Sequence, residues 1–159
     1  MIMITSIRIA AALHNSSRRG IAAVECAIVV PLLALLVLGA IDVGQYANVY
    51  QKVSDASREG ARVAVQYETL TKSQVETAVL SYLEGVFPNV PLSVLASATS
   101  IAVTDSGGNP ISGGDMTSVA SGAPVSVSVT VRFDLIRWIS HLQFLNGSDV
   151  TLTTAMRRE

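Results

Sequence analysis

The sequence predicts an α+β protein with a long N-terminal helix, a short second helix and a small antiparallel sheet. Three observations predict this class: one long apolar run near the N-terminus, a helical periodicity that continues directly after it, and alternating β-branched residues in the second half. The 159 residues leave room for one ordinary domain. Because half of the chain is hydrophobic and only 14% is charged, an intrinsically disordered protein is excluded.

The apolar run predicts a single membrane-spanning helix over residues 21–41. No polar side chain occurs from Cys26 to Ile41, and Glu25 is the one interruption in the five residues before. A helix of 21 residues reaches about 32 Å, which matches a hydrocarbon core of about 30 Å. Glu25 must then lie near the edge of the bilayer.

The basic residues predict how this helix is oriented. Arg8, Arg18 and Arg19 precede it with no acidic residue among them, so the positive-inside rule places residues 1–20 in the cytoplasm and residues 42–159 on the other side of the membrane. The alternative is a cleaved secretory signal. Such a signal needs two small residues before its cleavage site, and Leu38 occupies one of those places.

The same helix is expected to continue beyond the membrane to about Gln66. Apolar and small residues recur every three or four positions, at 43, 46, 50, 53, 57, 60, 64 and 67. No proline or turn cluster separates this pattern from the span. We therefore expect one continuous helix from Ile21, with residues 42–159 forming an extracytoplasmic α+β domain.

A second helix is predicted over Thr71–Val86. Ser73 and Glu76 have the spacing of a capping box, and Pro88 follows the end of the helix. Its predicted apolar face consists of Val75, Val79, Tyr82, Leu83 and Val86.

Strands are predicted in the second half of the chain. The clearest is Pro124–Leu135, where valines alternate with serine, threonine and arginine. Thr99–Thr104 and Asp149–Met156 are the other two, the last after a turn at Asn146-Gly147. Asp105–Ala123 carries five of the eleven glycines and is expected to be a loop.

The charge and the reactive residues exclude several functional classes. With 11 basic and 12 acidic residues the chain lacks the basic surplus of a nucleic-acid-binding protein. A single cysteine cannot form an intramolecular disulfide, and two histidines offer little for a metal site or for acid–base catalysis. We expect no catalytic residue, no metal and no cofactor, and hence no enzyme.

Glu25 is the most informative polar residue. A carboxylate inside an apolar segment is costly and indicates a functional role with a cationic partner, although a glutamate that reaches the headgroups is the alternative. Pro31 removes one backbone hydrogen bond from the helix. Ala40 and Gly44 form a small-xxx-small pair that allows close helix packing, and Gly60 on the apolar stripe indicates a close approach by another chain segment.

Arg58, Glu59 and Arg62 form a charged cluster on the polar face of the helix. Glu59 and Arg62 are three residues apart, which suits an ion pair on one helix face. Two interpretations stay open: a docking surface for a partner, or a solvated face whose charges pair with one another.

Residues 18–66 resemble the TadE-like family of tight-adherence (Flp) pilus assembly proteins. The resemblance rests on Arg18-Arg19-Gly20 followed by an apolar helix with Glu25 at its fifth position, on Val30-Pro31-Leu32, on Gly39, Asp42 and Gly44, and on Ala56-Ser57-Arg58-Glu59-Gly60-Ala61-Arg62. The C-terminal Thr153–Glu159 is similar in character. One departure is Cys26, which stands where Flp-type prepilins usually carry an aromatic residue.

The resemblance implies a processing site and a set of partners. A prepilin peptidase would cut between Gly20 and Ile21, and Glu25 would pair with the new N-terminal amine of a neighbouring subunit. The chain would be a single-pass inner-membrane minor pilin or pseudopilin, with a pilin-like fold, that helps to assemble an adhesive pilus. Its partners would be the lipid bilayer, the major pilin, a sibling minor pilin and the inner-membrane platform.

Other functions stay open at this point. A membrane-tethered extracytoplasmic binding or sensor module predicts an uncut N-terminus and indifference to Glu25→Ala. An enzyme or adhesin released by signal peptidase predicts a soluble product that begins near Ile41. The sequence also does not separate a TadE-like from a TadF-like protein, or a fibre subunit from an assembly factor at the base.

Overall fold

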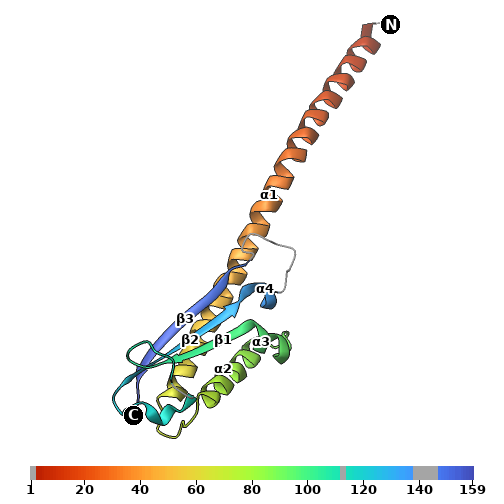
Figure 1. The fold of residues 1–159 in the computed structure, drawn as a ribbon. Coiled ribbons are helices and arrows are strands. Elements are labelled where there is room, and N and C mark those ends of the chain that lie inside the picture. Colours follow the sequence, from red (N-terminus) through yellow and green to blue (C-terminus); the bar gives the residue numbers. More distant parts are fainter. Residues whose placement is uncertain (1–2, 112–113, 138–146) are drawn as a thin grey trace. The chain divides into compact units, whose positions relative to one another are not determined.

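The computed structural model describes residues 3–111, 114–137 and 147–159, with the side chains described from residue 22 onward (Figure 1). The chain divides into two compact units, residues 1–41 and residues 42–159. The first unit is helical; the second, which we call the head, combines helices and a sheet. The predicted α+β class is thereby confirmed.

The long helix α1 spans Met3–Ala64. It ends close to the predicted Gln66 but begins at Met3 rather than at the expected Ile21. Residues 3–20 contain no proline, and their single glycine costs only about 1 kcal/mol in a helix. Nothing in this sequence therefore prevents residues 3–20 from being helical. Pro31 lies inside α1.

The head contains a three-stranded antiparallel sheet in the order β1–β2–β3. β1 is Thr99–Thr104, β2 is Pro124–Arg132 and β3 is Asp149–Arg157. Val103 of β1 lies opposite Val127 of β2, and Val129 of β2 lies opposite Leu152 of β3. The predicted strands are therefore confirmed, with small differences at their ends.

One face of the sheet packs on α1. The four valines of β2, Val125, Val127, Val129 and Val131, are fully buried, as the alternating pattern predicts. The hydroxyls of Ser57 in α1 and Thr154 in β3 are 2.7 Å apart, which places β3 beside the helix. The other face carries serine and threonine, where Thr130 and Thr151 share a hydrogen bond of 2.9 Å.

The second helix, α2, spans Lys72–Val86 and buries Val75, Val79 and Leu83 as predicted. Its capping box differs from the prediction. The Gln74 side chain, not that of Glu76, accepts a hydrogen bond from the backbone N–H of Thr71 (2.9 Å). Glu76 instead pairs with Lys72 at 3.1 Å.

Three short helical segments were not predicted. α3 (Leu92–Ala98) lies between α2 and β1, η2 (Met116–Ser118) lies in the predicted loop, and α4 (Phe133–Ile136) follows β2. The prediction that β2 runs to Leu135 is wrong. Phe133 lies beyond the end of the strand but is still buried, so the alternation of buried and exposed residues does not show where the strand ends. Gly147 takes a φ of +73°, as the predicted turn requires; its partner Asn146 lies outside the described residues.

Hydrogen bonds from the C-terminal residues connect two loops of the head. Arg158 is only 7% exposed. Its guanidinium donates hydrogen bonds to the backbone carbonyls of Thr69 (3.3 Å) and Met116. The backbone N–H of Glu159 donates to the carbonyl of Val65 at 3.0 Å, next to the end of α1.

Candidate subunit-packing surface

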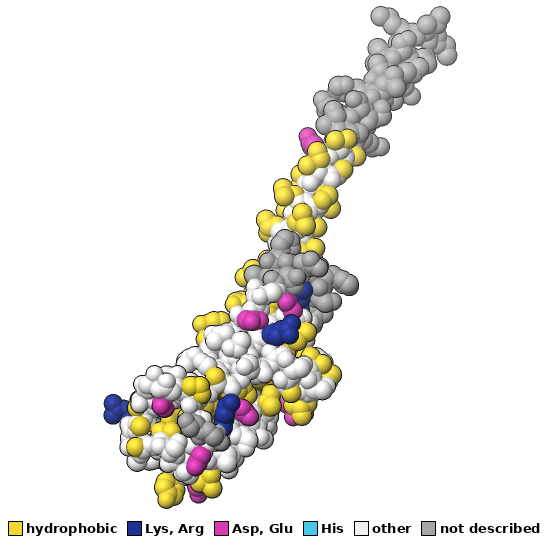
Figure 2. Space-filling view, in the orientation of Figure 1, with side chains coloured by type: hydrophobic (Ala, Val, Ile, Leu, Met, Phe, Trp, Pro, Cys, Tyr) yellow, Lys and Arg dark blue, Asp and Glu magenta, His cyan; other side chains and the backbone are white. Residues whose placement is uncertain are grey.

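The helix of the first unit exposes apolar side chains all round. The helical stretch Ala22–Ala64 contains an 18-residue window of mean hydropathy 2.6, and none of that window is buried within the chain. Ile28 is 70% exposed and Leu36 is 67% exposed, and Figure 2 shows hydrophobic side chains on the visible part of the helix that extends beyond the head. By length and composition this helix could span a membrane.

The structure places the predicted packing residues of this helix on its open surface. Glu25 and Pro31 are exposed, and Cys26 is an exposed free thiol. Gly20 and Ile21 are part of α1, but their side chains lie outside the described residues. The processing and packing roles that the sequence predicts for these residues therefore stay predictions.

Ala40 and Gly44 are also open. Ala40 is exposed, and a Cβ built on Gly44 would have no atom within 4 Å. Between them lies Asp42, which is fully buried. Space for a close approach by another helix therefore exists at Gly44.

Gly60 lies in a different environment from Gly44. It is buried inside the head, where a Cβ would come within 2.6 Å of Val79 Cγ2 and 3.2 Å of Val127 Cγ1. The predicted close approach is present, but side chains of α2 and β2 in the same chain make it. Intramolecular packing therefore explains this glycine, and Gly60 does not contribute to an open surface.

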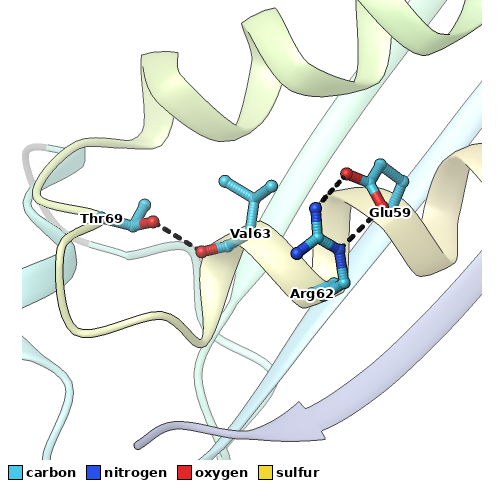
Figure 3. Close-up of polar contacts among 4 residues, drawn as sticks. All are labelled: Glu59, Arg62, Val63 and Thr69. Carbon is cyan, nitrogen blue, oxygen red and sulfur yellow. Dashed lines mark hydrogen bonds and ion pairs between the residues drawn. The ribbon is translucent and has the colours of Figure 1, made fainter.

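The charged cluster of α1 faces away from the core. Arg62 makes two hydrogen bonds to the carboxylate of Glu59, Nε to Oε2 at 2.9 Å and Nη2 to Oε1 at 2.6 Å (Figure 3). Arg58 lies 3.6 Å from Asp55 in a second, looser ion pair. The residues predicted as a docking face are therefore paired within the helix and still largely exposed.

These contacts shift the proton affinity of both members of the tighter pair. The hydrogen bond from Arg62 lowers the pKa of Glu59, and the positive charge of Arg62 acts in the same direction. The pKa of Arg62 is raised by the same hydrogen bond. Both groups are thus charged at neutral pH, and the pair is kept across the pH range in which most proteins work.

The end of α1 beside this cluster is capped locally. The Thr69 hydroxyl donates a 2.6 Å hydrogen bond to the carbonyl of Val63 in the last turn, which also accepts a 3.2 Å hydrogen bond from the backbone N–H of Gln66 (Figure 3). The next segment thus folds back immediately, and Arg62 stays at the rim of the head.

Sequence reasoning missed one feature of this surface. A hollow on α1 is lined by Tyr50, Gln51, Ser54, Asp55 and Arg58. Tyr50 was placed on the buried stripe, but its side chain is 47% exposed. The spacing from Tyr50 to Ser54 and Arg58 is four residues, and this repeat was the available signal.

Among residues 22–111, 114–137 and 147–159 no cluster of three or more His, Cys, Asp or Glu side chains could hold a metal ion. The polar groups of the described surface are arranged as ion pairs and hydroxyl contacts.

The comparisons with known proteins agree with the sequence resemblance. Residues 20–62 match the family described as TadE-like protein. The match covers the apolar helix and the charged cluster, and it ends two residues before α1 does. No curated protein and no solved structure gave a match. The resemblance to the TadE-like family is thereby confirmed for residues 20–62.

Proposed function

We propose that the chain is a membrane-anchored minor pilin or pseudopilin of a tight-adherence (Flp) pilus. The family match over residues 20–62 is the observation that carries this proposal. The matched segment includes an apolar helix whose side chains are not covered by the described part of the chain. A bilayer before assembly, and other pilus subunits afterwards, would cover those side chains.

Processing and packing follow from the positions of three residues. A prepilin peptidase would cut between Gly20 and Ile21, so that Glu25 lies close to the new N-terminus. A carboxylate in an apolar environment needs a cationic partner, and the amine of a neighbouring subunit supplies one. Pro31 would shape the helix, and Ala40 with Gly44 would allow close contact with another helix.

The topology proposed for this function is single-pass in the inner membrane. Residues 1–20 would be cytoplasmic and the head would lie in the periplasm. From there the head can meet the major pilin, a sibling minor pilin and the inner-membrane platform. Arg58, Glu59 and Arg62 would form part of its docking face, and its role would be mechanical, in surface adhesion or biofilm formation.

The first test is the mass and N-terminal sequence of the chain extracted from membranes, with and without a co-expressed type IV-like prepilin peptidase. We expect a peptidase-dependent product that begins at Ile21. Gly20→Leu should prevent its formation, whereas Gly39→Leu, a matched change inside the same helix, should leave it intact.

Other N-termini would overturn the processing. A start at Met1 in both samples would favour a tethered binding or sensor module, and a soluble product beginning near Ile41 would favour a secreted protein. Once the start at Ile21 is established, Glu25→Gln should reduce incorporation of the chain into pili without changing cleavage.

A further inference from the structure

Two rows of side chains with opposite charge run side by side on the exposed face of α1. Asp55 and Glu59, four residues apart, form what we call the acidic ridge; Arg58 and Arg62, also four apart, form the basic ridge. Arg58 is 68% exposed, Asp55 54%, Arg62 58% and Glu59 33%. Rows at this spacing are the ridges with which helices pack against one another.

Each ridge continues toward the start of the head without charge. The acidic ridge is preceded by Val43, Ala47 and Gln51, and the basic ridge by Tyr50 and Ser54, at the same spacing of four. Val43 is 59% exposed and Tyr50 47% exposed. The hollow lined by Tyr50, Gln51, Ser54, Asp55 and Arg58 lies between the two rows, and we call it the α1 groove.

The uncharged half and the charged half of this face would contribute differently to the binding of a partner. Exposed ion pairs contribute little net stability, because solvent screens them, but they determine orientation and register. Exposed apolar groups such as Val43 and Tyr50 gain more from being covered. A partner that covers the groove would therefore be bound by the first half and oriented by the second.

We propose that the α1 groove binds the same groove of a second copy of this chain, with the two helices parallel. This inference rests on the proposed function, because membrane insertion from one side makes the helices of two copies parallel. The inference specifies which molecule binds the docking face, whereas the proposed function gives several pilus subunits as partners.

Charge complementarity selects both the partner and the orientation. When two parallel helices are related by a two-fold axis along their length, the ridge on one side of the groove faces the opposite ridge of the other copy. Asp55 and Glu59 of each copy then face Arg58 and Arg62 of the other. In an antiparallel pair the acidic ridges would face each other, and so would the basic ridges, which costs several kcal/mol of repulsion.

The surface along this contact allows the helices to approach. Gly44, Gln51, Asp55 and Arg62 are spaced by seven, four and seven residues, so they lie on one side of the helix. The built Cβ of Gly44 meets no atom within 4 Å, so the partner helix has space there. The ion pairs within each helix, at 3.6 Å and 2.6 Å, would exchange for pairs between copies.

Disulfide cross-linking of the full-length chain in its native membrane tests this proposal. Cys26→Ser removes the single cysteine, and Gln51→Cys then places one thiol in the groove. Mild oxidation should produce a covalent dimer of the chain. The matched control is Ser81→Cys, an exposed position on α2, which should yield about tenfold less dimer because no contact holds two copies together there.

Charge reversal in the same Gln51→Cys background tests the orientation. Arg58→Glu with Arg62→Glu makes both ridges acidic and should lower the dimer yield about tenfold. Adding Asp55→Arg and Glu59→Arg exchanges the two ridges, restores the complementarity, and should restore the yield. This rescue distinguishes a specific contact from a general loss of folding.

Each of the other possible outcomes would contradict the proposal. Equal dimer yields at positions 51 and 81, or no effect of charge reversal, would show that the copies do not meet through the groove. A cross-link to a chain of different mass would make another subunit the partner. If the peptidase-dependent start at Ile21 persists in these cases, the proposed function stands and only the second copy is excluded.

Discussion

Residues 22–41 and the head contain the same kinds of apolar residue in opposite situations. In the helix of residues 22–41, Leu33 is 54% exposed and Leu36 is 67% exposed, whereas Leu83 and Leu95 of the head are fully buried. The head thus covers its apolar side chains with its own helices and sheet. The first unit leaves its apolar side chains uncovered by the described part of the chain.

The contrast also divides α1 along its length. Val37 is 54% exposed, while Val53, sixteen positions later, is fully buried against the sheet and α2. Only the second stretch has an inner and an outer face. In that stretch the inner side of the helix is held by the head, and the outer side is left exposed.

The largest expected effect separates the two regions with one substitution. Leu83→Ala should destabilise the head by about 2–5 kcal/mol, because it leaves a cavity in a packed core. Leu33→Ala, the same change in the exposed helix, should leave the stability of the head unchanged. Denaturant unfolding of the full chain in detergent, followed by near-UV circular dichroism, measures both. Equal losses would contradict the division into two independent units.

The next largest expected effect concerns the insertion of the apolar helix of the first unit into a membrane. Leu33→Arg should oppose insertion by about 2.5–3.5 kcal/mol, because position 33 is close to the middle of the span. Leu33→Phe keeps the side chain apolar and serves as the control. We expect the arginine variant to shift from the membrane to the soluble or degraded fraction on cell fractionation. Full membrane retention of the arginine variant would show that this helix is not surrounded by lipid.

The elements with strong periodicity were predictable from the sequence. The four valines of β2 alternate with polar residues, and α2 buries the face that its spacing of three and four predicts. Each of these elements is long enough for a period to be seen. α3, with seven residues, and α4, with four, are too short to show one, and their burial depends on tertiary contacts.

The candidate site divides in the same way. The ion pair of Glu59 and Arg62 follows from a spacing of three residues, so the sequence predicts it. The packing of Gly60 against Val79 and Val127 depends on two elements that are distant in the sequence, so a spacing pattern cannot show which chain segment approaches.

Gly60 and Gly44, two of the glycines of α1, extend the comparison with an expected effect of intermediate size. Gly60→Ala should destabilise the head by about 1 kcal/mol, because the new methyl group would lie 2.6 Å from Val79 Cγ2, and the cost of the overlap exceeds the gain in helix propensity. Gly44→Ala meets no atom and should stabilise the helix by up to about 1 kcal/mol.

A double substitution identifies the cause of the effect at Gly60. Val79→Ala removes the atom that the new methyl group would meet, so the two changes together should cost less than the sum of the single changes. Thermal unfolding of the four variants gives the coupling. Strict additivity would mean that the cost at Gly60 does not come from overlap with the Val79 side chain.

The smallest effect is the pH dependence of the pair formed by Glu59 and Arg62. Arg62 lowers the pKa of Glu59 in the folded head, so the unfolded chain binds a proton at this site more readily than the folded chain does. The stabilisation is therefore present above the ordinary pKa of a glutamate and is lost as the pH falls through the lowered pKa. Arg62 keeps its charge throughout this range, because its own pKa is raised.

Glu59→Gln measures this contribution. Its loss of unfolding free energy relative to the original chain should be small at neutral pH, because solvent screens the pair, and should disappear in acid. The control is Glu84→Gln, an exposed glutamate of α2 that makes no ion pair within the described part of the chain. If the loss at Glu59 stayed constant down to acid pH, the stabilisation would come from packing of the side chain.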